Sequence, residues 1–328
     1  MVKIDIVSGF LGAGKTTLIK KLLKDAFQGE QVVLIENEFG EIGIDGGFLK
    51  EAGIQIREMN SGCICCSLVG DFGASLKEVV EKYHPDRILI EPSGVGKLSD
   101  VIKAVQGVEK EVDITLNSYT TVVDAKKCKM YMRNFGEFFN NQVEYAGAII
   151  MSRTDIVDEE KATKAMELLR EINKNAAIIT TPIEKLEGKK LLEVMEHPVS
   201  LEEELLKEEH EHHHDHDEEC GCGHDHHHDH HHHHADEVFT SWGRETIKKY
   251  TREALEKMLE ALSASEDYGI ILRAKGMLPA EDGTWIYFDM VPEETEIREG
   301  APEYTGRLCV IGSKLNEEKL AQLFGLNA

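Results

Sequence analysis

Residues 9–16 read Gly-Phe-Leu-Gly-Ala-Gly-Lys-Thr, which is a complete G-x-x-x-x-G-K-[ST] phosphate-binding loop. The loop follows an apolar stretch expected to be a strand, Ile4–Ser8, and opens a stretch expected to be a helix, Lys15–Ala26. Glycines let backbone N–H groups turn towards a phosphate, and the helix N-terminus adds a favourable dipole. A strand, a glycine-rich turn and a helix in this order predict that the chain binds a nucleoside triphosphate.

Side chains and backbone of this loop have separate expected roles. The Lys15 ammonium is expected to reach the β- and γ-phosphates, which makes Lys15 a candidate catalytic residue. The Thr16 hydroxyl is expected to complete the ligand shell of Mg²⁺, so Mg²⁺ bound with the nucleotide is the expected cofactor. The other loop residues predicted to bind the nucleotide are Gly9, Gly12, Ala13, Gly14 and Thr17.

Composition and charge limit which partners and which cellular compartment we expect. The 328 residues favour two domains, and the formal net charge of −24 argues against a nucleic-acid partner, which requires a basic face. No apolar run approaches the roughly 18 to 20 residues that span a bilayer, and the first strand begins too early for a signal peptide. Seven cysteines, three of them packed within residues 63–66, fit a reducing compartment. We therefore expect a cytoplasmic protein with no membrane partner.

Residues 1–197 alternate short apolar stretches with helical ones. This alternation predicts an α/β domain of the P-loop NTPase class, with a mostly parallel sheet covered by helices on both faces. The expected helices include Leu18–Asp25, Leu76–Tyr83 and Glu159–Asn173. The expected strands are Ile4–Ser8, Val32–Ile35, Gln55–Met59, Arg87–Ile90, Tyr119–Val123, Ala148–Ser152 and Ala177–Thr181.

Residues 198–236 interrupt this pattern. An acidic stretch expected to be helical, Leu201–Glu209, leads into a tract with almost no apolar side chain. Residues 208–237 carry eleven acidic residues and no Lys or Arg. Such a segment cannot bury enough apolar surface to offset its ordering entropy, so we predict a disordered linker.

Residues 237–328 again have the pattern of a folded domain, which we predict to be smaller and of the α+β class. The expected helices are Thr246–Leu262 and Glu317–Phe324. The expected strands are Gly269–Ala274, Thr284–Met290 and Arg307–Ile311.

A second nucleotide-binding element is expected where a later strand ends. The stretch Arg87-Ile-Leu-Ile-Glu91-Pro-Ser-Gly94 is an apolar strand that ends in an acid. As a second candidate catalytic residue, Glu91 would hold the water shell of the metal or the attacking water, and the Gly94 N–H would contact the γ-phosphate. The alternative is that Glu91 is only a surface acid at a strand end.

A loop that reads the base is expected after a further strand. Ser152-Arg153-Thr154-Asp155 stands where GTPases carry Asn-Lys-x-Asp. The Asp155 carboxylate can accept hydrogen bonds from guanine N1 and N2, a pattern that adenine cannot donate, so the residue favours GTP over ATP. The Arg153 stem can cover the face of the base. Because Ser152 is shorter than Asn, we expect the bridge from this position to the phosphate loop to be lost.

Three thiols lie in Cys63-Ile64-Cys65-Cys66, between the two expected phosphate-sensing elements. Thiolates this close together can converge on one soft ion, and a fourth position left open suits transfer of the ion better than permanent structural binding. Glu36 and Glu41, from the loop after the second expected strand, are candidate carboxylate ligands. The alternative is that the cysteines are buried or incidental.

Fourteen of the sixteen histidines fall between His210 and His234. Neutral imidazole binds Zn²⁺, Ni²⁺, Co²⁺ and Cu²⁺, so the tract can load several ions, although a flexible tract cannot select one by geometry. A solvated spacer is the alternative, but it does not explain the use of His rather than Ser, Gly or Glu. The auxiliary metal ligands that we name are His212, His213, His214, Cys220, Cys222 and His226.

These motifs together resemble the CobW-type metal-associated GTPases, relatives of the urease and hydrogenase nickel-insertion GTPases. The resemblance extends over essentially the whole chain, because the region after the His tract also looks like the family's second domain. It implies a slow GTPase whose hydrolysis is coupled to metal delivery or cofactor maturation, with metal at the cysteines. The strings that carry it are residues 8–17, 36–41, 60–66, 91–94, 273–277 and 308–312.

The resemblance and the residues lead to one main hypothesis. The chain is a GTP-hydrolysing metallochaperone that takes Zn²⁺ most readily, or Co²⁺ or Ni²⁺, at the cysteine site and delivers it to a client metalloprotein through the C-terminal domain. A homodimer bridged by metal or by the nucleotide loops fits the same hypothesis. One alternative is a GTP-dependent maturation factor for a cobalt or corrinoid enzyme, with a regulatory metal. The others are a metal buffer with a vestigial nucleotide site and a small-molecule kinase.

Overall fold

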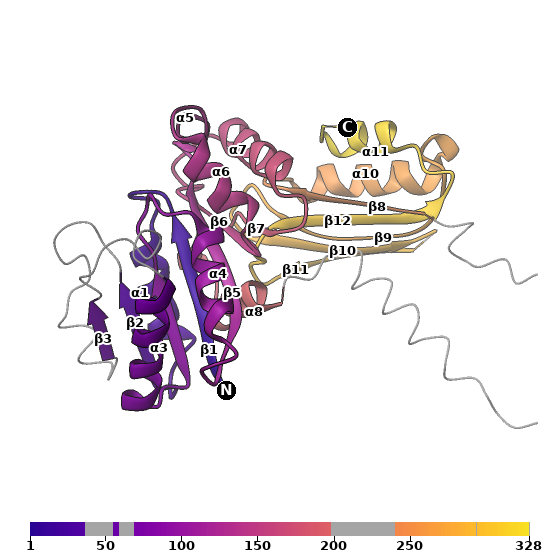
Figure 1. The fold of residues 1–328 in the computed structure, drawn as a ribbon. Helices are drawn as coiled ribbons and strands as arrows, with labels where there is room; N and C mark the ends of the chain where they lie inside the picture. Colours follow the sequence, from indigo (N-terminus) through magenta and orange to yellow (C-terminus); the bar gives the residue numbers. More distant parts are fainter. Residues whose placement is uncertain (37–54, 59–68, 198–239, 293, 328) are drawn as a thin grey trace, which may run out of the picture. The chain divides into compact units, whose positions relative to one another are not determined.

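The computed structural model describes residues 1–36, 55–58, 69–197, 240–292 and 294–327, and the rest of the chain lies outside that description (Figure 1). The chain divides into two compact units, residues 1–198 and 199–328. In the described part of the chain, no helix is long and apolar enough to cross a membrane.

The first unit is built on a parallel sheet of seven described strands in the order β3-β2-β4-β1-β5-β6-β7. Its central strands are buried along almost their whole length, as expected when helices cover both faces of a parallel sheet. The predicted α/β P-loop class is therefore confirmed. The strands are β1 (Val2–Gly9), β2 (Val32–Glu36), β3 (Gln55–Glu58), β4 (Arg87–Glu91), β5 (Ile114–Asp124), β6 (Ala148–Ser152) and β7 (Ala177–Ile179).

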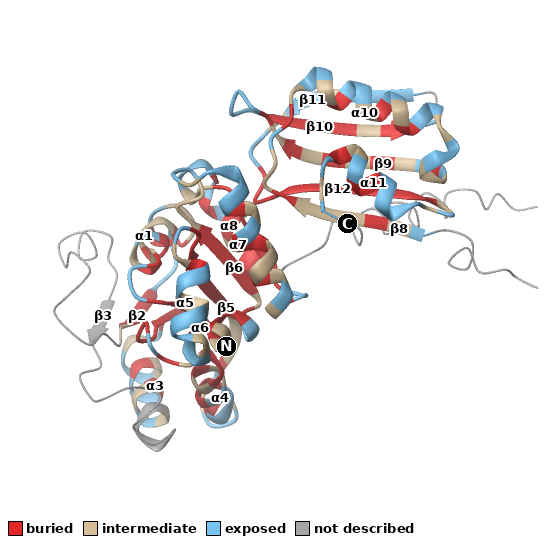
Figure 2. Ribbon diagram, turned by 90° about the horizontal axis from the view of Figure 1, so that it is seen from above, coloured by how far each residue is buried: buried red, intermediate tan, exposed pale blue. Residues whose placement is uncertain are grey.

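Helices cover both faces of this sheet (Figure 2). On one face α1 packs against α8, and on the other α3 packs against α4, which also contacts α6. The sequence of helix α1 explains why the helix packs on the sheet. Its apolar side chains recur every three or four residues and so form one face, which is buried: Leu18, Ile19, Leu22 and Leu23. The helices are α1 (Lys15–Asp25), α3 (Val69–Tyr83), α4 (Leu98–Val108), α5 (Cys128–Asn134), α6 (Gly136–Glu144), α7 (Glu159–Ile172) and α8 (Gly188–Glu196).

A buried ionic cluster lies where β1, β4 and β5 begin, at the edge of the sheet opposite the phosphate loop. The Arg87 side chain is 2% exposed and forms ion pairs with Asp5, Glu30 and Glu196, at 2.7 Å to Glu30 and 3.0 Å to Glu196. Asn117 Nδ2 donates to both Asp5 and Glu196 at 2.8 Å. The cluster ties the last helix of the unit to three neighbouring strands.

The second unit is an antiparallel sheet of five described strands in the order β11-β10-β9-β12-β8. Helices α10 (Arg252–Ala264) and α11 (Glu317–Phe324) cover the face that carries the apolar core. The strands are β8 (Thr240–Thr246), β9 (Ile270–Pro279), β10 (Trp285–Val291), β11 (Glu294–Gly300) and β12 (Gly306–Ser313).

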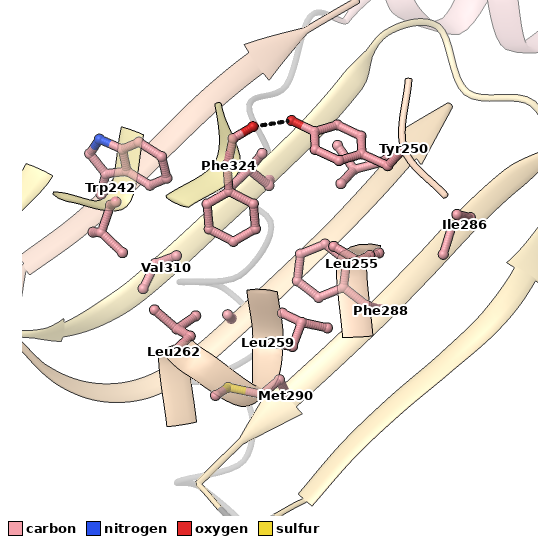
Figure 3. Packing of buried hydrophobic residues seen from close by; sticks show 14 of the residues in the cluster. Trp242, Tyr250, Leu255, Leu259, Leu262, Ile286, Phe288, Met290, Val310 and Phe324 are labelled. Atoms are coloured by element: carbon pink, nitrogen blue, oxygen red, sulfur yellow. Dashed lines mark hydrogen bonds between the residues drawn. The ribbon is translucent and has the colours of Figure 1, made fainter. Parts of the chain in front are cut away.

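The core of this unit joins the closing helix to the sheet (Figure 3). The Trp242 ring of β8 stacks on Phe324 with ring centroids 6.1 Å apart. Tyr250 Oη donates to the Phe324 carbonyl oxygen at 2.9 Å, which satisfies a phenol buried in an apolar core. The second unit therefore has the α+β architecture predicted from the sequence.

One expected helix boundary in this unit is wrong. The sequence pattern placed a helix over Thr246–Leu262, but Thr246 ends β8, where it pairs with Gly306, and α10 begins only at Arg252. The Thr251 side chain accepts a hydrogen bond from the Ala254 N–H and so caps the helix at its true start. Helix propensity alone placed residues 246–251 in the helix. In the structure, pairing with β12 makes Thr246 part of a strand, and residues 247–251 precede α10 outside any helix.

Candidate functional site

The phosphate loop leaves β1 at the centre of the sheet and depends on glycines for its path. Gly9, Gly12 and Gly14 have φ angles of 144°, 68° and 111°, a region that side chains disfavour. At Gly9 a Cβ would lie 2.4 Å from the Val122 carbonyl oxygen, so only glycine permits this approach to β5. The loop is closed by a hydrogen bond of 3.1 Å from the Ala13 N–H to the Phe10 carbonyl.

Helix α1 begins directly after this loop, at Lys15. Gly14 occupies the position before the helix and brings no side chain to cap it. The first N–H groups of a helix have no acceptor within the helix, so those of Lys15, Thr16 and Thr17 can serve an anion. The structure therefore provides the cradle that a phosphate needs at the point where the sequence motif predicts it.

Lys15 and Glu91 form a buried ion pair at the end of β1 and β4. Lys15 Nζ lies 3.7 Å from Glu91 Oε1, and the side chains are 7% and 3% exposed. Thr16, the next residue of α1, is half-buried and offers a hydroxyl. Carboxylate, hydroxyl and phosphate oxygens are the hard ligands that Mg²⁺ prefers, so these residues fit a Mg²⁺-bound nucleotide. Thr16 and Glu91 would hold the ion and its water shell.

Glu36 lies next to Glu91 in the sheet. The two residues are partners in the parallel register of β2 and β4, where laterally paired residues share a face. Glu36 is half-buried and is the last residue of β2. Of the residues predicted to bind metal, the structure brings Glu36 to the edge of the sheet where the phosphate loop lies. The other predicted ligands lie outside the described residues, namely Glu41, Cys63, Cys65, Cys66, His212, His213, His214, Cys220, Cys222 and His226.

The part of the chain that the structure describes contains no group of three or more His, Cys, Asp or Glu side chains arranged to hold a metal. The described cysteines, Cys128 and Cys309, are single and buried. Burial, together with the nearby Asp124 carboxylate, raises the pKa of the Cys128 thiol to about 12. Cys128 therefore stays protonated at neutral pH, which makes it a poor metal ligand.

Gly94 follows β4 and touches the phosphate loop. A Cβ at Gly94 would lie 2.8 Å from Leu11 Cδ2 and 3.0 Å from the Leu11 nitrogen. Gln142 of α6, which is fully buried, donates from Nε2 to the carbonyl oxygens of Gly94 and Gly96 at 3.1 and 2.8 Å. The loop expected to contact the γ-phosphate is thus held from both sides.

The predicted base-reading loop follows β6 and contacts the phosphate loop. Ser152 Oγ donates to the Ala13 carbonyl oxygen at 2.6 Å. The expectation that the short Ser152 side chain loses this bridge is therefore wrong, because the two loops approach closely enough for a hydroxyl to span them. Arg153, at φ 62°, forms an ion pair with Asp124 and donates to the Gly12 carbonyl oxygen at 3.0 Å.

Asp155 lies in the same loop and its side chain is exposed, as a carboxylate that meets a nucleobase must be. Thr154 Oγ1 donates to the Thr180 carbonyl oxygen at 2.7 Å, which ties the loop to the end of β7. The predicted residues Lys15, Thr16, Glu91, Gly94 and Asp155 therefore all lie at loops that leave the carboxyl edge of one sheet. Ligands of open α/β sheets bind at this edge.

Reasoning from the sequence missed three residues that shape this site: Asp124, Gln142 and Thr180. Asp124 ends an apolar strand just as Glu91 does, so the same signal, an acid after a buried strand, could have identified it. Gln142 and Thr180 have no comparable local signal. Their contacts to Gly94 and Thr154 join segments more than 25 residues apart and depend on the fold.

A glycine loop that opens a helix, a buried lysine–carboxylate pair and an exposed carboxylate in the loop after β6 are together the features of a P-loop nucleotide-binding protein. Family comparison specifies it further. Residues 3–180 match the family described as CobW/HypB/UreG, nucleotide-binding domain, and residues 239–325 match the one described as Cobalamin synthesis protein cobW C-terminal domain. The chain belongs to the CobW/HypB/UreG family of P-loop GTPases, which confirms the resemblance stated from the sequence motifs.

Individual relatives carry related names. The chain is 31% identical over 185 residues to Zinc chaperone CobW of Sinorhizobium sp, covering 48% of this chain and 52% of that protein. It is 31% identical over 185 residues to Zinc chaperone YjiA of Escherichia coli K12, and the match covers 55% of this chain and 57% of that protein. The chain spans about half the length of these zinc chaperones.

Two matches cover more of the chain. Zinc-regulated GTPase metalloprotein activator 1 of Schizosaccharomyces pombe is 24% identical over 325 residues, covering 90% of this chain and 76% of that protein. Among solved structures, the Zn(II)-bound YjiA GTPase from E. coli aligns with a TM-score of 0.43 and 22% identity, covering 100% of this chain and 99% of that one.

Proposed function

We propose that this chain is a GTP-hydrolysing metallochaperone that binds a transition metal, with zinc as the first candidate, at Cys63, Cys65 and Cys66. The nucleotide state of the first unit controls how tightly this metal is held. The metal is then delivered to a client metalloprotein. The observation that carries the proposal is the attachment of the cysteine segment to the same edge of the sheet as the Lys15–Glu91 pair.

That attachment follows from strand register. Glu58, the last residue of β3, pairs with Glu36 of β2, which in turn pairs with Glu91 of β4. Strands lie about 4.8 Å apart, so the backbone at Glu58 is about 10 Å from that at Glu91. Cys63 follows Glu58 by five residues, and Val69 of α3 follows Cys66 by three. The cysteines thus follow closely on a strand end that lies two strands from Glu91, and α3 begins three residues after Cys66.

The choice of GTP rests on Asp155 and its loop. An exposed carboxylate beside the phosphate loop matches the N1 and N2 donors of guanine, and Arg153 is positioned against Gly12 with its guanidinium paired to Asp124. For hydrolysis, Lys15 stabilises charge on the β- and γ-phosphates, and Glu91 orients the water around Mg²⁺. Thr16 and Glu91 would hold Mg²⁺ and its water shell, and the ion would supply positive charge that offsets the charge developing on the phosphates.

The choice of metal rests on the ligand set and on the relatives. Thiolates bind soft metal ions, whereas carboxylates alone prefer hard ions such as Mg²⁺. A site of three cysteines with Glu36 or Glu41 therefore suits Zn²⁺, Co²⁺ or Ni²⁺. Relatives named zinc chaperones make Zn²⁺ the first ion to test. The His-rich tract, including His212, would gather ions for the cysteine site, and the C-terminal domain would recognise the client.

Coupling between the two ligands follows from linkage. If Mg·GTP changes the affinity for metal by some factor, metal must change the affinity for GTP by the same factor. Residues 37–54 connect β2 to β3. If this connection contacts Mg²⁺ or the γ-phosphate, the nucleotide state would change the position of Glu36 or Glu41. The affinity for a metal held by that carboxylate and the cysteines would then change as well. The proposal therefore predicts a reciprocal effect that can be measured from either side.

The test is a Zn²⁺ titration, against a competing chelator, of a variant lacking residues 210–234, in Mg·GDP and in Mg²⁺ with a non-hydrolysable GTP analogue. We expect one tight equivalent whose affinity depends on the nucleotide and which disappears in Cys65→Ala/Cys66→Ala. Cys128→Ala is the matched control and should keep the tight equivalent. Nucleotide affinity measured without Zn²⁺ should be unchanged in both cysteine variants.

Two outcomes would contradict the proposal. Tight Zn²⁺ binding that survives in Cys65→Ala/Cys66→Ala would place the metal elsewhere. Hydrolysis of GTP with no coupling to Zn²⁺, Co²⁺ or Ni²⁺ would favour the maturation-factor alternative, in which the cysteine segment contacts the client rather than carrying metal.

A further inference from the structure

Beyond the nucleotide site, the first unit exposes an apolar surface that its own fold does not cover. We define the α5 surface by Leu11, Val95, Phe135 and Phe138 together with α5 itself. Leu11 and Val95 are 55% and 39% exposed, and Phe135 and Phe138 are 46% and 37% exposed. Met130, on α5, is 43% exposed as well. Exposed apolar side chains that are clustered rather than scattered mark interaction sites.

Contacts join the phosphate loop, Tyr131 and Phe135 within this surface. Phe10 lies beneath them, with its ring centroid 4.5 Å from that of Tyr131 and 5.2 Å from that of Phe135. Tyr131 Oη reaches the Leu11 carbonyl oxygen at 3.5 Å. Leu11 in turn contacts the loop of Gly94 and Val95. The surface thus spans the phosphate loop, the loop after β4, and helices α5 and α6.

The same surface is basic in a strongly acidic protein. Residues 125–136 hold four cations, Lys126, Lys127, Lys129 and Arg133, and no acid, although the chain carries a net charge of −24. Lys126, Lys129 and Arg133 are exposed, and Lys127 lies with its Nζ 5.8 Å from the centre of the Tyr131 ring. These cations are therefore presented beside the apolar side chains and not spread around the unit.

The acids that flank this segment in the sequence do not cancel its charge. Asp124 is buried and paired with Arg153, and Glu137 is paired with Lys97 at 2.8 Å. Lys97 Nζ also lies 5.9 Å from the centre of the Phe138 ring. Asp124 and Glu137, the acids that flank residues 125–136 in the sequence, are thus each engaged with another cation.

We propose that the α5 surface docks an acidic segment of a partner protein that carries apolar or aromatic side chains among its Asp and Glu residues. Carboxylates would meet Lys126, Lys129 and Arg133, while the apolar side chains cover Phe135, Phe138 and Leu11. Charge complementarity selects this partner. A nucleic acid would meet the repulsion of a chain with net charge −24 and would leave the apolar side chains exposed.

The test selects random 12-residue peptides displayed on phage against the full chain with Mg·GDP bound. The same selection is run on Lys126→Glu/Lys129→Glu. The matched control is Lys24→Glu/Lys189→Glu, which makes the same change of charge at exposed sites on α1 and α8, on the other face of the sheet. Circular dichroism and affinity for labelled GDP establish that each variant folds and keeps its nucleotide site.

We expect peptides enriched in Asp and Glu together with Leu, Phe or Trp. Synthetic copies should bind Lys126→Glu/Lys129→Glu about tenfold or more weakly than the unmodified chain and should bind the control within about twofold. Met130→Ser and Phe138→Ser should each weaken binding without a change of charge, which separates the apolar contribution from the electrostatic one.

Three results would overturn the proposal. One is a peptide pool with no acidic bias, or peptides that bind the two double variants equally well. Another is a parallel loss of GDP affinity in Lys126→Glu/Lys129→Glu, which would assign these lysines to the nucleotide site. The third is binding of single-stranded oligonucleotides or of anionic phospholipid vesicles that depends on Lys126 and Lys129 while acidic peptides do not bind.

Discussion

Lys15 Nζ lies 3.7 Å from Glu91 Oε1, and these two charged groups are almost fully removed from solvent. A buried carboxylate is costly unless a cation accompanies it, so Lys15 stabilises Glu91 in this structure. A bound Mg·GTP would offer Lys15 the phosphates and Glu91 the metal's water shell. The pair therefore places both charges beside the phosphate loop, where the nucleotide can use them.

Glu91→Gln separates binding from hydrolysis. The amide keeps the size of the carboxylate but cannot hold the water around Mg²⁺ as a charged acceptor, so single-turnover phosphate release should fall about 100-fold. Affinity for labelled GTP should change by only a few fold, because Lys15 and the loop backbone remain. Lys15→Ala serves as the contrast and should lose nucleotide affinity itself. Unchanged phosphate release in Glu91→Gln would assign Glu91 a purely structural role.

Asp155→Asn tests which base the site reads. An amide cannot accept two hydrogen bonds from guanine N1 and N2, but its NH₂ can donate to the oxygen that xanthine carries at C2. GTP affinity should fall about 100-fold and affinity for xanthosine triphosphate should rise. Asp158→Asn is the matched control, because Asp158 caps α7 through the Lys161 N–H and asparagine caps a helix equally well. Equal GTP affinity in both variants would remove Asp155 from the base site.

Gly94→Ala tests contact with the γ-phosphate. The new Cβ would lie 3.0 Å from the Leu11 nitrogen, so the loop must shift and carry its N–H away from the phosphate loop. We expect the affinity for a non-hydrolysable GTP analogue to fall about tenfold relative to that for GDP, since only the triphosphate uses this donor. Gly136→Ala, at the start of α6, is the control because its Cβ meets only the end of the Asn140 side chain. An equal loss for both nucleotides would show a general distortion of the loop.

The sequence predicted the elements whose signals are local. A strand, a glycine loop and a helix follow one another within residues 2–25, and strands β2, β4, β6 and β7 read as apolar runs. Strands β8 and β11 were missed because most of their residues are polar and form no apolar run, so only pairing with β12 and β10 reveals them. Pairing between distant segments is the information that a local pattern lacks.

The same division holds within the candidate site. The motif predicted that Lys15 and Thr16 open a helix directly after a glycine loop, because the glycines specify that backbone path. Their contacts with a nucleotide remain predictions. It could not predict that Ser152 reaches Ala13, because that distance depends on how β6 lies against the phosphate loop. The predicted cysteine and histidine ligands remain predictions, because they lie outside the described residues.

Glu196 makes the stability of the first unit depend on pH. Burial alone raises the pKa of Glu196, but hydrogen bonds from Asn117 and Arg87 and the charges of Arg87 and Lys3 outweigh it, so the pKa lies below its ordinary value of 4.5. A lowered pKa means that the ionised group stabilises the folded state above about pH 4.5, and that this contribution is lost as the pH falls. At pH 7, Glu196→Gln should therefore lower the free energy of unfolding by about 1 to 3 kcal/mol.

The unmodified chain and Glu196→Gln should converge as the pH falls below 4.5 and through the lowered pKa of Glu196, because the unmodified chain then loses the same contribution. Glu193→Gln, an exposed position on the same helix, is the control and should change stability by less than about 0.5 kcal/mol. Both tryptophans, Trp242 and Trp285, belong to the second unit, so their fluorescence reports whether that unit is unaffected. Hydrogen exchange of β1 and β4 reports on the first unit. A difference between Glu196→Gln and the unmodified chain that does not shrink as the pH falls progressively below 4.5 would attribute the effect to packing and not to the carboxylate charge.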